Sequence, residues 1–149
     1  MHPFPHRYAV VANAGSGADV RVESAGLPAL TTTVPPEFDG PEGQWSPETL
    51  LVAAVADCYV LTFRGIANRF KLPWTALSCE VVGTLDRVER VTKFVEFNVH
   101  AQLRIPIGGS VDEARRLLVR AEETCLITRS LCGQTHLRTS VELVTPVAA

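Results

Sequence analysis

Hydrophobic and polar positions alternate most regularly in the second half of the chain, between residues 91 and 105. The apolar positions of this run are Val95, Phe97, Val99, Ala101, Leu103 and Ile105. A period of two predicts a strand with one buried and one solvated face. With residues 77–88 this strand is expected to form a hairpin. Three shorter β-prone runs, 8–12, 19–23 and 29–34, are separated by glycine-containing turns and predict a meander, and 135–144 predicts a last strand.

Two segments show helical patterns. The first begins at Ser46, followed by Pro47 and Glu48, which is a favourable order of cap, first helical residue and acid. It is expected to run to about Arg69, with Cys58 deep inside it. Because it is apolar nearly all round, it should be a central helix covered on more than one side. The second helix is expected after Ser110, on an apolar face formed by Val111, Ala114, Leu118, Ala121 and Cys125.

The predicted order of elements is therefore βββ-α-ββ-α-β. Residues 35–43 contain prolines and glycines that should exclude a regular element, so we expect a loop there. The order lacks the regular β-α alternation of a doubly wound sheet, which makes α+β the expected fold class. A length of 149 residues suits one domain, residues 1–149.

Composition narrows the expected partners. The net charge is −2 and the basic residues are scattered, which argues against a nucleic-acid partner. The longest uninterrupted apolar run, residues 50–56, is far shorter than a membrane span of about twenty residues, so no membrane partner is expected. The N-terminus lacks the apolar stretch of a signal peptide, and the expected location is the cytoplasm.

The sequence lacks the residue spacings of common metal-binding and nucleotide-binding motifs. The sequence has no Cys-x-x-Cys, no His-x-x-x-His and no phosphate-binding loop, so we expect neither a bound metal nor a bound cofactor. Among the four cysteines, Cys58 and Cys125 each fall on an apolar helix face. If the two helices pack together, these thiols could cycle between dithiol and disulfide. The alternative is that both are small core side chains, which is also the favoured reading for Cys79 and Cys132.

Residues 36–41, 46–51 and 56–58, together with 121–127, resemble the motifs of the OsmC/Ohr superfamily, in the same order. The resemblance extends from about residue 20 to 144. It implies an intertwined homodimer in which antiparallel sheets wrap two long central helices. It also implies a cytosolic peroxidase that reduces organic hydroperoxides and is itself reduced by an external dithiol.

The resemblance further implies roles for three residues. Cys58 would attack the peroxide as a thiolate, Cys125 would resolve the resulting sulfenic acid, and Glu48 would hold an activating arginine. Burial and the neighbouring Asp57 should raise the pKa of Cys58, so a cation is expected to compensate. Glu48 lies ten residues before Cys58, about 15 Å along one helix, so it would have to act from the other subunit.

The matched positions for the family's arginine hold Gly17 and Glu37 in this chain, and Leu126 stands where the family often has proline. Arg21, Arg64 and Arg129 are the alternative cations, and the sequence does not choose among them. Two functions therefore stay open: a two-cysteine peroxidase, or a non-peroxidase dimer on the same scaffold that binds a small ligand or senses redox state through its thiols.

Overall fold

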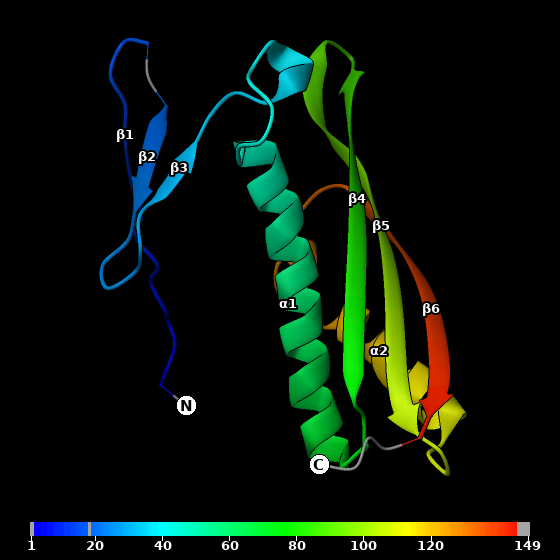
Figure 1. The fold of residues 1–149 in the computed structure, drawn as a ribbon. Helices are drawn as coiled ribbons and strands as arrows, with labels where there is room; N and C mark the ends of the chain where they lie inside the picture. The colour runs from blue at the N-terminus through cyan, green and yellow to red at the C-terminus, as the bar shows by residue number, and fades with distance from the viewer. Residues whose placement is uncertain (1, 18, 146–149) are drawn as a thin grey trace. The chain divides into compact units, whose positions relative to one another are not determined.

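The computed structural model describes residues 2–17 and 19–145 (Figure 1). Contacts divide the chain into two compact units, Met1–Leu51 and Val52–Ala149, which are described separately below. The expectation of one domain stays a prediction. The observed elements follow the predicted βββ-α-ββ-α-β order, with two short 3₁₀ turns added.

The N-terminal unit contains a small antiparallel sheet. Its strands β1 (Val11–Asn13), β2 (Val20–Glu23) and β3 (Leu30–Thr32) pair in sequence order, which confirms the meander, although each strand is shorter than predicted. The proline-rich segment holds one 3₁₀ turn, η1 (Pro36–Phe38), where only a loop was predicted. The turn forms because a proline is tolerated in the first turn of a helix, where its missing N–H has no partner to lose.

Helix α1 (Pro47–Phe70) begins and ends within one residue of the prediction. The Ser46 hydroxyl accepts a 3.2 Å hydrogen bond from the Thr49 amide and caps the first turn. The fully buried positions of α1 are Val55, Tyr59, Phe63 and Ala67. Cys58 lies in the middle of α1 as predicted, but it is half-buried and borders the buried stripe. Because the buried positions are four residues apart, Tyr59 lies at the centre of the buried face and Cys58 lies at its edge.

The second sheet contains β4 (Ala76–Val88), β5 (Val91–Pro106) and β6 (Gln134–Val144). β4 and β5 form the predicted antiparallel hairpin, and β6 pairs with β5 in parallel (Figure 1). The predicted alternation is confirmed, because the alternate apolar side chains of β5 from Phe97 to Ile105 are buried. Gly83 on β4 is required by packing: a Cβ there would lie 2.8 Å from Val52 Cγ2 and 2.9 Å from the Phe94 ring.

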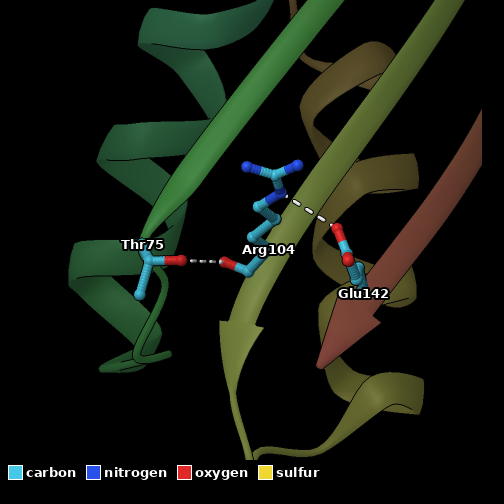
Figure 2. Close-up of polar contacts among 3 residues, drawn as sticks. All are labelled: Thr75, Arg104 and Glu142. Carbon is cyan, nitrogen blue, oxygen red and sulfur yellow. Dashed lines mark hydrogen bonds and ion pairs between the residues drawn. The ribbon is translucent and has the colours of Figure 1, made fainter. Parts of the chain in front are cut away.

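The opposite face of this sheet is polar. Figure 2 shows Arg104 of β5, whose Nε donates to Glu142 Oε2 of β6 at 2.9 Å. On the other side the Arg104 carbonyl accepts a 3.2 Å hydrogen bond from the Thr75 hydroxyl, just before β4. These contacts lie on the exposed face of the sheet. The helices pack on its other face.

Helix α2 (Val111–Glu123) connects the parallel strands β5 and β6 and packs mainly on β6. Ser110 caps it as predicted, because its side chain accepts a 3.2 Å hydrogen bond from the Glu113 amide. Helices α1 and α2 meet where the buried Tyr59 hydroxyl donates to the Leu118 carbonyl at 3.1 Å. A short 3₁₀ turn, η2 (Thr128–Ser130), follows α2 and had no counterpart in the prediction.

Helix α1 has the length and apolar composition of a membrane span, with a mean hydropathy of 1.7 over its most apolar 18 residues. Asp57 and Arg64 interrupt the apolar run of this helix without lowering its mean hydropathy greatly, so the longest uninterrupted run is much shorter than the helix. Core helices of soluble proteins have the same properties, and only 22 % of this window is buried within the chain. The expectation of no membrane partner stays a prediction.

Candidate active site

Cys58 lies in an open pocket of about 420 Å³ within the Val52–Ala149 unit. Helix α1 and the turn after α2 form its wall, which consists of Ala54, Asp57, Cys58, Leu61, Thr62, Leu126 and Ile127. Most of these side chains are apolar, and Asp57 is the one charged side chain among them. The pocket therefore offers an apolar molecule access to a thiol.

The pKa of the Cys58 thiol is lowered. Burial raises this pKa, but hydrogen bonding from the Ile127 amide, the Cys125 thiol, the Thr62 hydroxyl and the Leu126 amide lowers it by more. The Cys58 sulfur lies 3.9 Å from the Thr62 oxygen, one helical turn away. The predicted effect of burial is confirmed, but the predicted net rise of this pKa is wrong, because the sequence did not show the donors around the sulfur.

Cys125 is completely buried beyond the C-terminal end of α2, not on the helix as predicted. The helix ends at Glu123, and the chain turns so that the Cys125 carbonyl accepts from the Thr128 hydroxyl at 3.1 Å. Burial raises the pKa of the Cys125 thiol, and its hydrogen bond to Cys58 raises it further. Cys58 is therefore the thiol of the pair that loses its proton more readily, and Cys125 is the one that keeps it to higher pH.

The candidate cations do not account for this difference. Arg64 and Arg129 are exposed and absent from the pocket wall. Arg21 pairs with Glu23 at 3.0 Å within the N-terminal unit. Within the described part of this chain neutral donors already lower the pKa of Cys58, and the expected cation stays a prediction.

Glu48 occupies the first turn of α1 in the N-terminal unit. Its Oε2 is inaccessible to solvent and has no hydrogen-bond partner among the residues that the structure describes. A buried carboxylate oxygen without a donor is costly. The role of Glu48 in the reaction stays a prediction.

The other two cysteines have different environments. Cys79 on β4 is half-buried, and burial together with the nearby Cys125 raises its pKa to about 11. Cys132 is exposed just before β6, so the expectation that it is a core side chain is wrong. Neither thiol lines the pocket with Cys58.

Sequence reasoning missed three contributors to the site: Thr62 and the amides of Leu126 and Ile127. Thr62 follows Cys58 by four residues, one helical turn, and this spacing was the available signal. The two amides have no signal in residue type, because every residue except proline carries the same N–H. Within residues 2–17 and 19–145, no three His, Cys, Asp or Glu side chains gather as a metal site, and the expectation of no cofactor stays a prediction.

Comparisons with known proteins identify the family of this chain. The family model described as OsmC-like protein matches residues 40–140. Among curated proteins, an uncharacterized protein, YmaD, from Bacillus subtilis is 26 % identical over 137 residues, covering 89 % of this chain and 91 % of that protein.

Solved structures have the same fold. An OsmC-like protein of unknown function from Vibrio cholerae superposes with a TM-score of 0.78 at 18 % identity, covering 93 % of this chain and 100 % of that one. An organic hydroperoxide resistance protein OsmC from Legionella pneumophila is 28 % identical, with a TM-score of 0.72 and coverage of 93 % and 100 %. These likenesses confirm the predicted α+β OsmC-like fold.

Proposed function

Because the chain belongs to the OsmC-like protein family, we propose that it is a two-cysteine peroxidase that reduces organic hydroperoxides. The observation that carries this proposal is the pair of thiols with opposite pKa shifts: lowered for Cys58 at an open pocket and raised for the buried Cys125. Such a pair suits a nucleophile and a resolving thiol. The organic hydroperoxide resistance protein from Legionella pneumophila supports the same class of substrate.

The reaction has three balanced steps. The Cys58 thiolate attacks the terminal peroxide oxygen, the O–O bond breaks, and the leaving alkoxide takes up a proton to become an alcohol. Cys58 is then a sulfenic acid. The Cys125 sulfur, after losing its proton, displaces hydroxide from this sulfenic acid, which gives a Cys58–Cys125 disulfide and water. An external dithiol reduces the disulfide by thiol–disulfide exchange and is itself oxidised.

The pocket wall favours organic over inorganic peroxides. Ala54, Leu61, Leu126 and Ile127 present apolar atoms beside the Cys58 sulfur. An alkyl or aryl group can transfer its apolar area from water to this wall, which hydrogen peroxide cannot do. Selectivity should therefore appear mainly as a lower KM for the bulkier peroxide.

The proposal includes a homodimer in the cytoplasm. A second copy would cover the apolar sides of α1 and supply a donor to the unpartnered Glu48 oxygen. Cytosolic thiols are kept reduced, which suits an enzyme that needs free Cys58 between turnovers. Size-exclusion chromatography with light scattering would detect the dimer, and a strictly monomeric protein at micromolar concentration would contradict this part of the proposal.

Turnover of cumene hydroperoxide with dithiothreitol tests the reaction. We expect peroxide consumption by the wild type, its loss in Cys58→Ser, and a single oxidation without efficient turnover in Cys125→Ser. Cys132→Ser is the matched control, because this exposed thiol lies outside the pocket wall. Mass spectrometry of the oxidised wild type should show a Cys58–Cys125 disulfide. Equal inertness of the wild type and Cys58→Ser would refute the peroxidase.

One observation favours a second function. The charged side chain in the pocket wall is the acidic Asp57, and none of the wall residues is basic. A site of this kind also suits a small apolar ligand or a redox sensor that oxidises once without turnover. An inert wild type that nevertheless forms the Cys58–Cys125 disulfide would support the sensor.

A further inference from the structure

The turn after Cys125 leaves two backbone amides without the usual backbone partner. In this turn the carbonyl oxygens of residues 125 and 127 accept from Arg129 and Ser130 at 3.2 and 2.9 Å. The Leu126 carbonyl accepts from the Ser130 hydroxyl at 2.8 Å. In contrast, the amides of Leu126 and Ile127 donate to no backbone carbonyl within the described part of the chain.

Both residues line the pocket in which Cys58 lies. Hydrogen bonding from both amides lowers the pKa of the Cys58 thiol. The Thr62 oxygen lies 3.9 Å from the Cys58 sulfur on the α1 side. Donors thus approach the same atom from two elements far apart in the sequence. Backbone N–H groups normally find an acceptor, and the pocket wall places the Cys58 sulfur beside both residues as a candidate acceptor.

We propose that the amides of Leu126 and Ile127 and the hydroxyl of Thr62 form a thiolate cradle that activates Cys58 without a basic side chain. This inference rests on the proposed peroxidase function, and it identifies the groups that stabilise the nucleophile. The Thr62 oxygen lies 3.9 Å from the reacting sulfur, and the two amides belong to residues of the same pocket wall. Their dipoles are fixed by the turn and by α1, so they favour the thiolate over the thiol before any substrate arrives.

The cradle acts against acidic neighbours. Asp57 faces the pocket from α1, Cys125 approaches from the turn, and Cys79 lies near Cys125 on β4. A carboxylate disfavours a nearby thiolate, whereas the Cys125 thiol supports it while it keeps its proton. The neutral donors must therefore supply the net preference for the thiolate. Removing one of them should have a larger effect than removing a distant arginine.

Because the cradle requires a backbone N–H at position 126, the residue type at this position is restricted. Proline has no N–H, so a proline at this position would remove one donor from the cradle without changing the apolar character of the wall. Leucine provides both the donor and an apolar side chain that is exposed at the pocket. The residue type at 126 thus determines how many donors reach Cys58.

The ionisation of Cys58 can be measured without peroxide. The wild type is alkylated with iodoacetamide between pH 5 and 9, and modification at Cys58 is followed by peptide mass spectrometry. Thr62→Val removes the hydroxyl at nearly constant volume, and Thr62→Ser is the conservative variant that keeps it. Leu126→Pro removes the amide, and Leu126→Ala keeps it. We expect Thr62→Val and Leu126→Pro each to lower the thiolate fraction at pH 7 by about tenfold.

The serine and alanine variants should alkylate with a profile close to that of the wild type, while Arg64→Gln and Arg129→Gln should change it little. An unchanged profile in Thr62→Val would overturn the cradle, as would an equal loss in either arginine variant. If Leu126→Pro does not fold, the Thr62 pair decides alone. If the protein is inert to peroxide but its Cys58 ionises as expected, the proposed function is refuted and the cradle is supported. If the protein reduces peroxide but Thr62→Val alkylates as the wild type does, the cradle is refuted and the proposed function is supported.

Discussion

Replacing Tyr59 by phenylalanine removes the hydrogen bond that joins the helix carrying Cys58 to the helix that leads into Cys125. The Tyr59 hydroxyl donates to the Leu118 carbonyl at 3.1 Å, and the side chain is 1 % exposed. Phenylalanine keeps the ring and its packing. The Leu118 carbonyl lies inside α2, where it also accepts the amide of the next helical turn, so the variant leaves no buried acceptor without a donor.

The loss should be that of one ordinary buried hydrogen bond, about 0.5–1.5 kcal/mol of unfolding free energy. For a chain of this length a loss of 1 kcal/mol lowers Tm by about 2–4 °C, so the decrease should be about 1–6 °C. Deleting the whole ring in Tyr59→Ala adds a cavity and should cost about 3–5 kcal/mol. The difference between the two variants separates the hydroxyl from the packing.

Urea unfolding followed by far-ultraviolet circular dichroism measures both variants at one protein concentration, because any association of folded chains would add to their stability. Tyr8→Phe is the matched control, since this tyrosine is 91 % exposed and should unfold with the wild type. A Tyr59→Phe protein with the wild-type midpoint would show that the hydroxyl does not tie the helices. A loss above about 3 kcal/mol would show that the ring itself had been displaced.

Three further outcomes follow from individual contacts. Ser110→Ala should lower the unfolding free energy by about 1 kcal/mol through loss of the α2 cap, and Ser110→Asp should retain it in urea unfolding. The folded-state pKa of Cys79 is raised from 9.0 to about 11, so its contribution to stability is present below pH 9 and is lost as pH rises to 11; Cys79→Ala should flatten this part of a stability–pH curve. Arg104→Met should cost less than about 1 kcal/mol in thermal unfolding, because Arg104 and Glu142 are 60 % and 63 % exposed.

The parts of the fold that follow from local patterns were predictable. The alternation before Ile105 located β5 because one face of that strand is buried by helices and the other is exposed. Ser46 and Ser110 located the helix starts because a side-chain oxygen satisfies free amides there. The parallel pairing of β5 with β6 had no local signal, since it depends on where α2 returns the chain.

The sequence predicted which cysteines form the candidate site, but it did not predict where Cys125 lies or in which direction the pKa of Cys58 shifts. The motifs selected Cys58 and Cys125, but a helical pattern placed Cys125 on α2, whereas the helix ends at Glu123 and leaves the thiol in the turn. That turn is what directs the amides of Leu126 and Ile127 to the pocket. Burial and charge, the two effects visible in sequence, both pointed to a raised pKa for Cys58, while the backbone donors that reverse the direction depend on tertiary structure.

The surface of α1 links the site to assembly. Four positions spaced by four residues are buried, yet the helix is apolar on its other sides as well, and only 22 % of its most apolar window is covered within this chain. Exposing such a helix to water is unfavourable by the area it leaves uncovered. The same helix carries Cys58 on a wall that is open and Glu48 with an oxygen that lacks a donor. A second copy packed on α1 would cover the open wall and could supply a donor to the Glu48 oxygen. Replacing an apolar residue on the uncovered side, such as Leu61, by a charged one should therefore change dimer formation and the environment of Cys58 together.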